Sequence, residues 1–354
     1  MLVGGSLGFW QRNGLIQSTQ QVTVTIANGQ TSGTATITAI DTTRTSLIWG
    51  GSSTTRNATY DGQQDLCGCT LTNSTTVTAT RSGTTNDLIV QVSVVQWKPG
   101  VTRSIQYGSI ALGNGVTSNT ATITSVTTAN AACHFLGLTH GAASASHTVS
   151  FGDVTLTNAT TVTSTRNTSS ANTCTVYFCV TEFAAGVLQS ATQHITIATS
   201  AASSATTAIT SSTVTRTLLL FGGFTTTTTT AESRDLPRID LTNATTVTIN
   251  LGGAFTSSVK ACVVEFKTAD LKQSMQRGTI VLTSVASNTA TITSVGTTKA
   301  FVSCLGHTSS STSNNVSEGT VVRSELTNAT TVTATAGSAH ASTKTLSYEV
   351  MEST

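Results

Sequence analysis

The residues suited to acid–base chemistry or metal binding are sparse in this chain of 354 residues, which has six histidines and fifteen acidic residues. The densest histidine group is His134, His140 and His147. No two of these stand two residues apart, as on one face of a strand, or four apart, as on one face of a helix. We therefore expect histidines in exposed loops and predict no catalytic centre from them.

Cysteines give an equally weak signal for chemistry. Cys67 and Cys69 lie close together, but no second Cys or His pair at zinc spacing accompanies them. The total of seven is odd, and most positions do not recur with the repeat described below, so a disulfide framework is not indicated. We expect reduced thiols in small core positions, with no metal and no cofactor.

Acidic residues recur near the end of the closing segment of three repeats, at Glu182, Glu265 and Glu352. Glycoside hydrolysis needs two carboxylates in one cleft. Recurrence at one position of each repeat favours a structural ion pair instead, with Arg277 as one partner. The sequence also lacks a nucleophile elbow, a phosphate-binding loop and a dinucleotide fingerprint. It therefore predicts a protein that is not an enzyme.

The elements that carry these residues come from a repeat. The phrase Leu-Thr-Asn-(Ala/Ser)-Thr-Thr-Val-Thr begins at Leu71, Leu156, Leu241 and Leu326, each 85 residues after the one before. This interval exceeds the roughly 20–50 residues usual for solenoid and propeller repeats. It suits a small domain that closes its own core, so we expect a separate globule for each repeat.

Within each repeat, short segments alternate apolar residues with Thr or Ser at the period of a β-strand. About six or seven such strands per repeat predict an all-β protein, a tandem array of four immunoglobulin-like or fibronectin-III-like antiparallel β-sandwich domains. The alternative is one large mixed β-barrel. The expected parts are an N-terminal attachment segment (1–18) and four β-sandwich repeats (19–100, 101–187, 188–271 and 272–354).

The asparagine of the repeated phrase is expected to close an Asx turn at a corner. In the second repeat this is Asn158, and Leu156 and Val162 would be the core-facing ends of the flanking strands. Met1 is followed by neither a basic region nor an adequate apolar run, so we predict no secretory signal. The sequons that the asparagines form are therefore expected to be structural.

Charged residues make up 9% of the chain, against about 25% in an average soluble domain, and the net charge is +2. Nucleic-acid binding needs clustered Lys and Arg, so a neutral, hydroxyl-rich surface argues against it. No stretch approaches the length of a membrane-spanning helix.

Several segments together carry a resemblance: Gln-Arg-Gly-Thr-Ile, Ser-Asn-Thr-Ala-Thr-Ile-Thr, Leu-Thr-Asn-Ala-Thr-Thr-Val-Thr-Ala-Thr and Val-Val-Glu-Phe. Over most of its length the chain resembles the repetitive β-rich proteins of tailed bacteriophage virions. The resemblance implies a tail-fibre, head-fibre or capsid-decoration role, a virion location, and other virion proteins as partners. Tandem domains would then act as a spacer, and a homo-oligomer is expected. A bacterial surface adhesin or S-layer component is the alternative.

Two regions are candidates for binding. The first is the N-terminal segment, where Phe9, Trp10, Leu15 and Ile16 are expected to dock onto another virion protein. The second is the set of variable loops, whose Ser, Thr and Asn residues would suit weak binding of host-surface glycans. The loop residues singled out for this are Tyr60, His140, His147 and His307.

Overall fold

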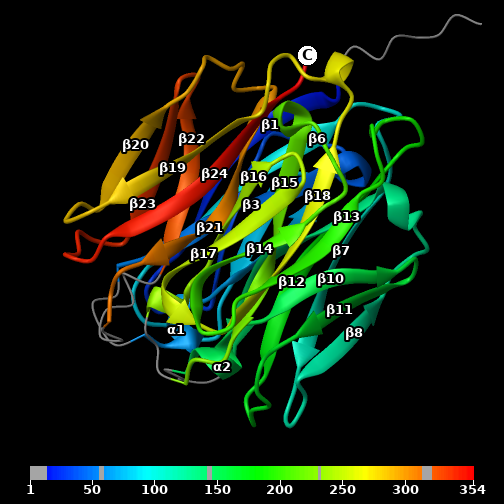
Figure 1. The fold of residues 1–354 in the computed structure, drawn as a ribbon. Helices are drawn as coiled ribbons and strands as arrows, with labels where there is room; N and C mark the ends of the chain where they lie inside the picture. The colour runs from blue at the N-terminus through cyan, green and yellow to red at the C-terminus, as the bar shows by residue number, and fades with distance from the viewer. Residues whose placement is uncertain (1–13, 56–59, 142–145, 230–232, 313–320) are drawn as a thin grey trace, which may run out of the picture.

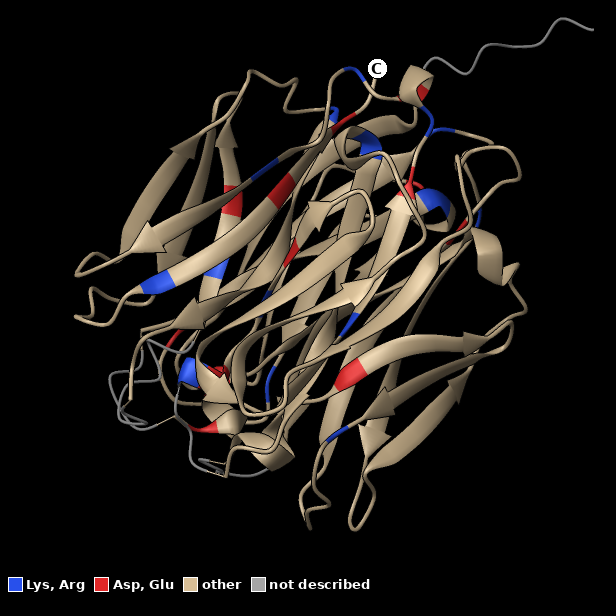
Figure 2. Cartoon of the chain, in the orientation of Figure 1, with Lys and Arg blue, Asp and Glu red and all other residues tan. Residues whose placement is uncertain are grey.

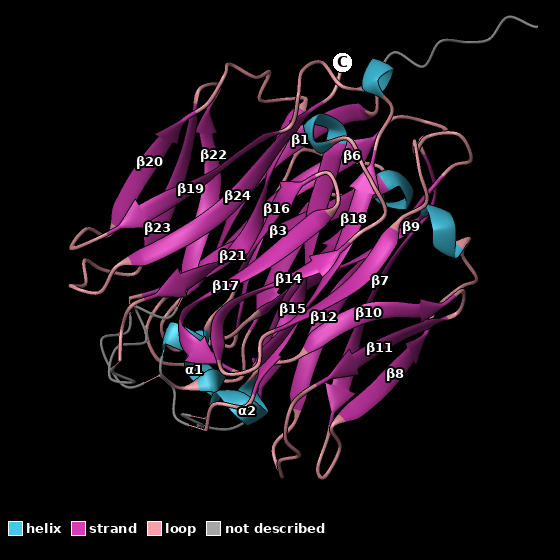
Figure 3. Ribbon diagram, viewed as in Figure 1, coloured by secondary structure: helices cyan, strands magenta, loops and turns pink. Residues whose placement is uncertain are grey.

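The computed structural model describes residues 14–55, 60–141, 146–229, 233–312 and 321–354. These residues form 24 strands, joined by short turns and single-turn helices (Figures 1 and 3). Six consecutive strands correspond to each sequence repeat, in agreement with the strand content expected from the alternating pattern.

The strand bounds follow the repeats. The first six strands are β1 (Ile16–Ile26), β2 (Ser32–Thr36), β3 (Thr45–Thr54), β4 (Gly68–Asn73), β5 (Thr76–Thr80) and β6 (Leu88–Trp97). The next six are β7 (Thr102–Leu112), β8 (Ser118–Thr122), β9 (Ala131–His140), β10 (Asp153–Asn158), β11 (Thr161–Thr165) and β12 (Cys174–Phe183). The third repeat gives β13 (Gln193–Ala198), β14 (Ala202–Ala208), β15 (Thr217–Thr226), β16 (Arg238–Asn243), β17 (Thr246–Phe255) and β18 (Ser257–Glu265). The fourth gives β19 (Gln276–Leu282), β20 (Ser287–Thr291), β21 (Ala300–Ser309), β22 (Val322–Asn328), β23 (Thr331–Ala336) and β24 (Lys344–Glu352).

The described helices are all very short. The two α-helical turns are α1 (Gly62–Asp65) and α2 (His147–Ser150). The 3-10 turns are η1 (Thr42–Arg44), η2 (Thr128–Asn130), η3 (Val214–Arg216), η4 (Ser233–Asp235) and η5 (Thr268–Asp270). In the second and third repeats, α2 and η4 stand at the place that α1 takes in the first, between the third and fourth strands.

Each six-stranded sheet is built from two repeats. The first, sixth and third strands of one repeat lie beside the fourth, fifth and second strands of the repeat before it, and the pairs in register are antiparallel. The sheet orders are β7-β12-β9-β4-β5-β2, β13-β18-β15-β10-β11-β8, β19-β24-β21-β16-β17-β14 and β1-β6-β3-β22-β23-β20. The last of these joins the first repeat to the fourth and so closes a ring.

The four sheets are arranged as the blades of a four-bladed β-propeller, so the predicted array of four tandem immunoglobulin-like or fibronectin-III-like sandwiches is wrong. The alternating pattern fits both folds, because each needs strands with one buried face. The 85-residue interval was also misleading, because it is longer than a usual propeller repeat. These blades have six strands each, where about four are usual, and therefore need more residues. The equal spacing of the repeated phrase indicated the number of repeats, but it did not show that neighbouring repeats share sheets.

The hydrophobic core crosses the repeat boundaries. One buried cluster contains side chains from all four repeats, among them Ile48, Phe183, Phe266 and Phe301. A second cluster combines Ile110 of the second repeat with Ile239 of the third. Buried apolar surface therefore stabilises the contacts between repeats, while a further cluster, which includes Ile280, Val302 and Leu346, lies within the fourth repeat alone.

The predicted Asx corner is confirmed in all four repeats. The Oδ1 atoms of Asn73, Asn158, Asn243 and Asn328 each accept a hydrogen bond of 2.9 Å from the backbone N–H two residues later. Leu156 and Val162 are both buried beside this corner, as expected. The repeated phrase is thus a hairpin that specifies the fourth and fifth strands of each repeat.

Ring closure uses the two ends of the described chain. The Leu15 N–H donates to the Ser353 hydroxyl at 2.5 Å, and the Thr19 N–H donates to the Thr298 carbonyl at 2.9 Å. Leu15 and Ile16 are fully buried in this joint, and β1 begins inside the segment expected to be an attachment arm. These two residues are therefore not available for docking to another protein, which corrects that part of the prediction.

Charged residues are few and dispersed over the blades (Figure 2). Among the residues that the structure describes, no helix is both long and apolar enough to cross a membrane.

Candidate functional site

A cavity of about 90 Å³ lies on the propeller axis. Its walls come from equivalent positions of all four repeats. The fifth residues of the third strands line it, namely Trp49, Phe135, Phe221 and Cys304. The residues that follow α1, α2 and η4 also line it, namely Leu66, Phe151 and Leu236, and Val321 of the fourth repeat does so too. The cavity is therefore a product of the closed ring and does not belong to any one repeat.

Glycines with positive φ shape the wall of this cavity. Gly51, Gly137, Gly223 and Gly306 have φ between 83° and 95°, and each pairs with the start of the fourth strand of a neighbouring repeat. A Cβ on Gly137 would lie 2.1 Å from the Cys67 carbonyl oxygen. Only glycine permits both the left-handed backbone and this close approach. At the same point the register of the third strand against the sixth strand of its own repeat shifts.

Three aromatic rings stand next to one another around the axis. The ring centroids of Trp49 and Phe135 are 6.0 Å apart at 81°, and those of Phe135 and Phe221 are 6.1 Å apart at 85°. Such edge-to-face contacts are favourable for aromatic pairs. Cys304 occupies the fourth equivalent position, where no ring is present. The missing ring leaves an apolar space next to three aromatic walls.

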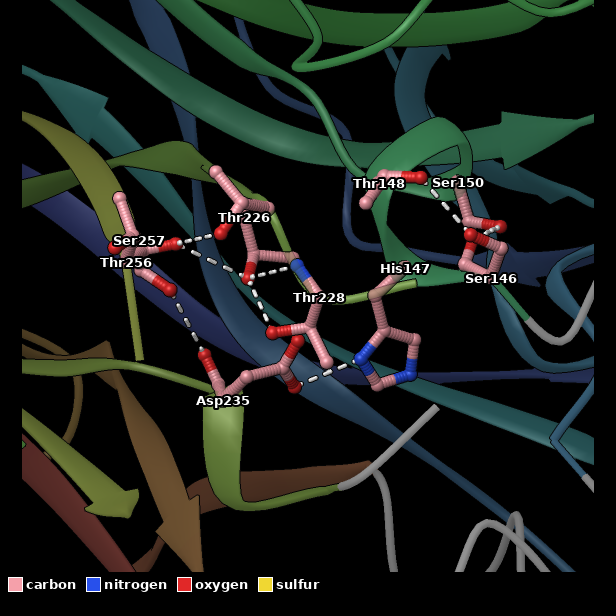
Figure 4. Close-up of polar contacts among 10 residues, drawn as sticks. Ser146, His147, Thr148, Ser150, Thr226, Thr228, Asp235, Thr256 and Ser257 are labelled. Carbon is pink, nitrogen blue, oxygen red and sulfur yellow. Dashed lines mark hydrogen bonds and ion pairs between the residues drawn. The ribbon is translucent and has the colours of Figure 1, made fainter. Parts of the chain in front are cut away.

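A second aromatic and polar group packs beside the cavity, near α1 and α2, which lie at one end of the molecule (Figure 1). Figure 4 shows the polar contacts around its His147. The ring of Phe151 lines the cavity and lies 4.9 Å from the ring of His147, which in turn lies 4.7 Å from the ring of Tyr60. His147 Nδ1 is 2.7 Å from Asp235 Oδ1. This hydrogen bond joins α2 of the second repeat to η4 of the third.

The His147–Asp235 pair resembles a base with its orienting carboxylate, but it is closed to solvent. Both side chains are 0% exposed. The neighbouring Ser150 hydroxyl donates to the Ser146 carbonyl at 2.8 Å and is not directed at the imidazole as a nucleophile would be. Burial also raises the pKa of the Tyr60 hydroxyl well above its ordinary value. The contact between His147 and Asp235 therefore joins two of the helical turns beside the cavity.

The loop residues predicted to bind glycans are mostly inaccessible. Tyr60, His140 and His147 are 2%, 0% and 0% exposed, so the expectation of surface loop residues is wrong for all three. Sequence spacing missed their burial because the contacts that cover them come from other repeats. His307 is partly exposed and lines the axial cavity. Phe9 and Trp10 lie outside the described residues.

The recurrent acids are structural, as expected. Glu182, Glu265 and Glu352 accept hydrogen bonds of 2.7 to 2.9 Å from the backbone N–H groups of Thr127, Thr213 and Gly296. Each carboxylate thus holds the connection between the second and third strands of its own repeat. The proposed partner was wrong, however, because Arg277 pairs with Glu349 at 2.5 Å.

The seven cysteines are free and buried, which confirms that they are core residues. Burial raises the pKa of the Cys67 thiol to about 12 and that of Cys304 to about 11, so neither is a reactive thiolate near neutral pH. Within the described ranges, no group of three or more His, Cys, Asp or Glu side chains is arranged to hold a metal ion.

The set of three aromatic side chains around the axis was not predicted, although the sequence contains a signal for it. Trp49, Phe135 and Phe221 all lie in the short apolar run that ends at glycine in each repeat. Three aromatic residues at equivalent positions could have indicated one shared site. Comparison with known proteins adds no further assignment, since no protein-family model and no curated protein sequence matches the chain.

Proposed function

We propose that the chain is a non-enzymatic structural protein of a bacteriophage virion, in the form of a compact body that decorates the capsid or tail. The observation that carries the proposal is the closed ring of four similar units, in which polar groups suited to chemistry make contacts that hold the fold. The resemblance of the repeated motifs to β-rich virion proteins gives the virion context.

The side chains best suited to chemistry are buried or hydrogen-bonded within the fold, and this supports a structural role. The three recurrent glutamates accept backbone N–H groups, the cysteines are buried thiols with raised pKa values, and the His147–Asp235 pair is sealed. A catalytic centre needs such groups to face a substrate. In this chain they face one another or the backbone.

Because the repeats close into a ring, the structural role we propose differs from that of an extended spacer. In a tandem array, each added domain extends the reach of the protein. In a propeller, the height is set by the strands, and β3, for example, has 10 residues, or about 33 Å. The proposed role is therefore a decoration or attachment body, and the spacer role expected from tandem domains is withdrawn.

The partners that fit this role are other virion proteins. Glycan binding through Tyr60, His140 and His147 is not proposed, because these side chains are buried. The exposed surface that remains is rich in threonine, as in the exposed positions of β8 and β20.

The test is to ask whether the protein is part of a particle. Particles from a phage that encodes this chain would be purified on a density gradient, and the chain quantified against the major capsid protein by mass spectrometry. We expect a fixed ratio between the two across the particle peak, and gold-labelled antibody on the particle surface. Recovery of the chain only in the particle-free fractions would overturn the proposal.

A further inference from the structure

The first half of each third strand pairs with another strand on one edge only. In β9, the residues from Ala131 to Phe135 pair with β12, whereas the pairing of β9 with β4 is confined to Gly137. This half of β9 is buried. Its backbone N–H and C=O groups on the open edge need partners, because unpaired polar groups in the interior are costly. Side chains of the next repeat supply them, so polar contacts help to close each junction between repeats.

The four junctions are closed by different polar groups. Between the first and second repeats, the Tyr107 hydroxyl accepts a hydrogen bond of 3.0 Å from the Leu47 N–H. Between the third and fourth repeats, Glu349 Oε2 accepts one of 2.7 Å from the Leu219 N–H. Between the fourth and first repeats, the Ser93 hydroxyl donates to a backbone carbonyl of β21 at 3.3 Å. These three groups gain no charge when the pH falls.

The junction between the second and third repeats is closed by an imidazole. His194 follows Gln193 at the start of β13, as Tyr107 follows Gln106 in β7. Its Nε2 accepts a hydrogen bond of 3.4 Å from the Cys133 N–H, the longest of the four contacts. A ring nitrogen accepts only while it carries no proton, so this contact requires a neutral His194.

Two neutral thiols lie near His194. Cys262 of β18 stands opposite it in the sheet, and the Cys262 thiol lies against the backbone of Cys133. Burial raises the pKa of Cys262 to about 12 and that of Cys133 well above its ordinary value, so neither thiol is charged. Neither can therefore compensate a positive charge on the imidazole.

The charged groups of the surrounding strands have other partners. On β18, Lys260 donates to the Thr196 hydroxyl at 2.8 Å, and Glu265 accepts from a backbone N–H of its own repeat at 2.9 Å. On β10, Asp153 accepts from a backbone N–H of β11 at 3.1 Å. Among the described residues, burial alone lowers the pKa of His194, and no carboxylate opposes this. The other histidines of β9 are His134 and His140.

We propose that the contact between β9 and β13 opens in acid, because protonation of His194 removes the acceptor of the Cys133 N–H and leaves a buried charge without a counter-ion. The ring then stays closed at the other junctions. A second neutral histidine borders the other side of β9, where His134 Nε2 donates to the Leu47 carbonyl at 2.7 Å. Protonation of His134 leaves this donor in place, so the acid-labile hydrogen bond is that of His194.

The pH range of the opening follows from the pKa of His194, which burial lowers to about 4 from 6.5. Its contribution to closure is complete above pH 6.5 and is lost as the pH falls towards 4. Between pH 7 and pH 4.5 this histidine raises the equilibrium constant for opening by about 60-fold. Glu349 has the opposite sign: burial raises its pKa, so protonation favours the closed form at the junction of the third and fourth repeats.

This inference goes beyond the proposed function and does not rest on it. A junction that stays closed in acid would leave the virion role standing. Absence of the chain from particles would leave the acid-sensitive junction standing.

The buried cysteines serve as reporters of the opening. Cys133 and Cys262 lie at the junction in question, whereas Cys69 lies in the first repeat and Cys304 in the fourth. The full chain would be held at pH 7 or pH 4.5 and exposed briefly to dithiodipyridine, which labels thiols in mild acid. Peptide mass spectrometry would identify the labelled cysteines, and each rate would be divided by that of the urea-unfolded chain at the same pH.

The corrected labelling of Cys133 and Cys262 should rise by about 60-fold from pH 7 to pH 4.5. Labelling of Cys69 and Cys304 should change much less, because their surroundings contain no contact that depends on His194.

The variant His194→Gln isolates the imidazole. The amide oxygen of glutamine can accept from the Cys133 N–H but does not titrate, and Gln21 takes the equivalent place in the first repeat. This variant should lose most of the rise in acid. His340→Gln is the matched control, since His340 lies between β23 and β24 and bonds to Ser342. It should respond to acid as the natural chain does.

Labelling of Cys133 and Cys262 that does not rise in acid would overturn the proposal. So would an equal rise at all seven cysteines, which indicates unfolding of the whole ring, or an undiminished rise in His194→Gln. Circular dichroism at pH 4.5 would establish that the strands persist. The comparison among the cysteines of the natural chain stands without any variant.

Discussion

The two halves of the propeller axis have equivalent frameworks and different contents. At the end where the chain termini meet, Trp97, Phe183 and Phe266 form consecutive edge-to-face contacts with centroids 5.4 and 5.5 Å apart, and all three side chains are buried. At the α1/α2 end, the rings of Trp49, Phe135 and Phe221 adopt a similar arrangement around a cavity. The first set of rings fills the buried core, and the second set lines the cavity.

The difference lies in the fourth position of each set. At the filled end, the joint between Leu15 and Ser353 and the side chains of the first strand close the space. At the hollow end, Cys304 is too small to meet the other three rings. A ring of four repeats thus obtains a filled half and a half with a cavity from a similar sequence pattern. The predictions below test this contrast, beginning with the largest effect.

Removal of a ring should be much more costly at the filled end. Phe183→Ala deletes the middle ring of the buried set, and we expect it to lower the free energy of unfolding by about 3–5 kcal/mol. Phe221→Ala removes a partly exposed ring beside an existing cavity and should cost less. Urea denaturation of the two variants would measure both losses. Equal losses would remove the distinction between core and wall.

A buried histidine makes the boundary between the two halves sensitive to acid. His134 Nε2 lies 2.7 Å from the Leu47 carbonyl, and burial lowers the pKa of His134 to about 4 from 6.5. Since protonation favours the unfolded chain, its contribution to stability is fully present above pH 6.5 and is lost as the pH falls towards 4. The loss amounts to about 3 kcal/mol.

The variant His134→Leu should remove part of this acid sensitivity, and Leu220 at the equivalent position of the third repeat shows that the site accommodates leucine. Burial also lowers the pKa of His194 to about 4, so some acid sensitivity should remain. Thermal melting between pH 7 and pH 4 would compare the two proteins. Identical pH profiles would contradict the assignment to His134.

The joint at the filled end should depend on one hydroxyl. Ser353→Ala removes the acceptor of the buried Leu15 N–H, and an unsatisfied buried N–H costs about 1–3 kcal/mol. Ser203→Ala, in an exposed position of β14, is the control and should have little effect. Chemical denaturation would give both values. A Ser353→Ala protein as stable as the control would mean that the ring does not need this bond.

Filling the hollow end should have the smallest effect and the opposite sign. Cys304→Phe adds the fourth ring and is expected to raise the free energy of unfolding by about 0.5–2 kcal/mol, as cavity-filling changes commonly do. A rise in melting temperature relative to Cys304→Ser would support this. A fall would show that the neighbouring side chains cannot make room for the ring.

Much of the local structure could be predicted from the sequence. Alternation of threonine with apolar residues predicted strands, and the phrase around Asn158 predicted a corner with an Asx turn, because both depend on interactions within a few residues. The recurrence of Glu182 and Glu265 predicted structural carboxylates for a similar reason, since each holds a connection within its own repeat.

The site could not be predicted in the same way. Tyr60, His147 and Asp235 come from three repeats and meet only where the ring brings their loops together. Spacing along the chain carries no information about such contacts. Burial of Tyr60 and His147 was therefore missed, although both residues had been singled out.

The sequence by itself determined four equal units, their six strands, their corners and the small buried thiols. The tertiary structure alone decided that these units share sheets, that the first repeat closes onto the fourth, and that the axis is filled at one end and hollow at the other. The physical reason is that a strand edge satisfies its hydrogen bonds equally well with any suitable neighbour. Only the packing of all four repeats selects which neighbour that is.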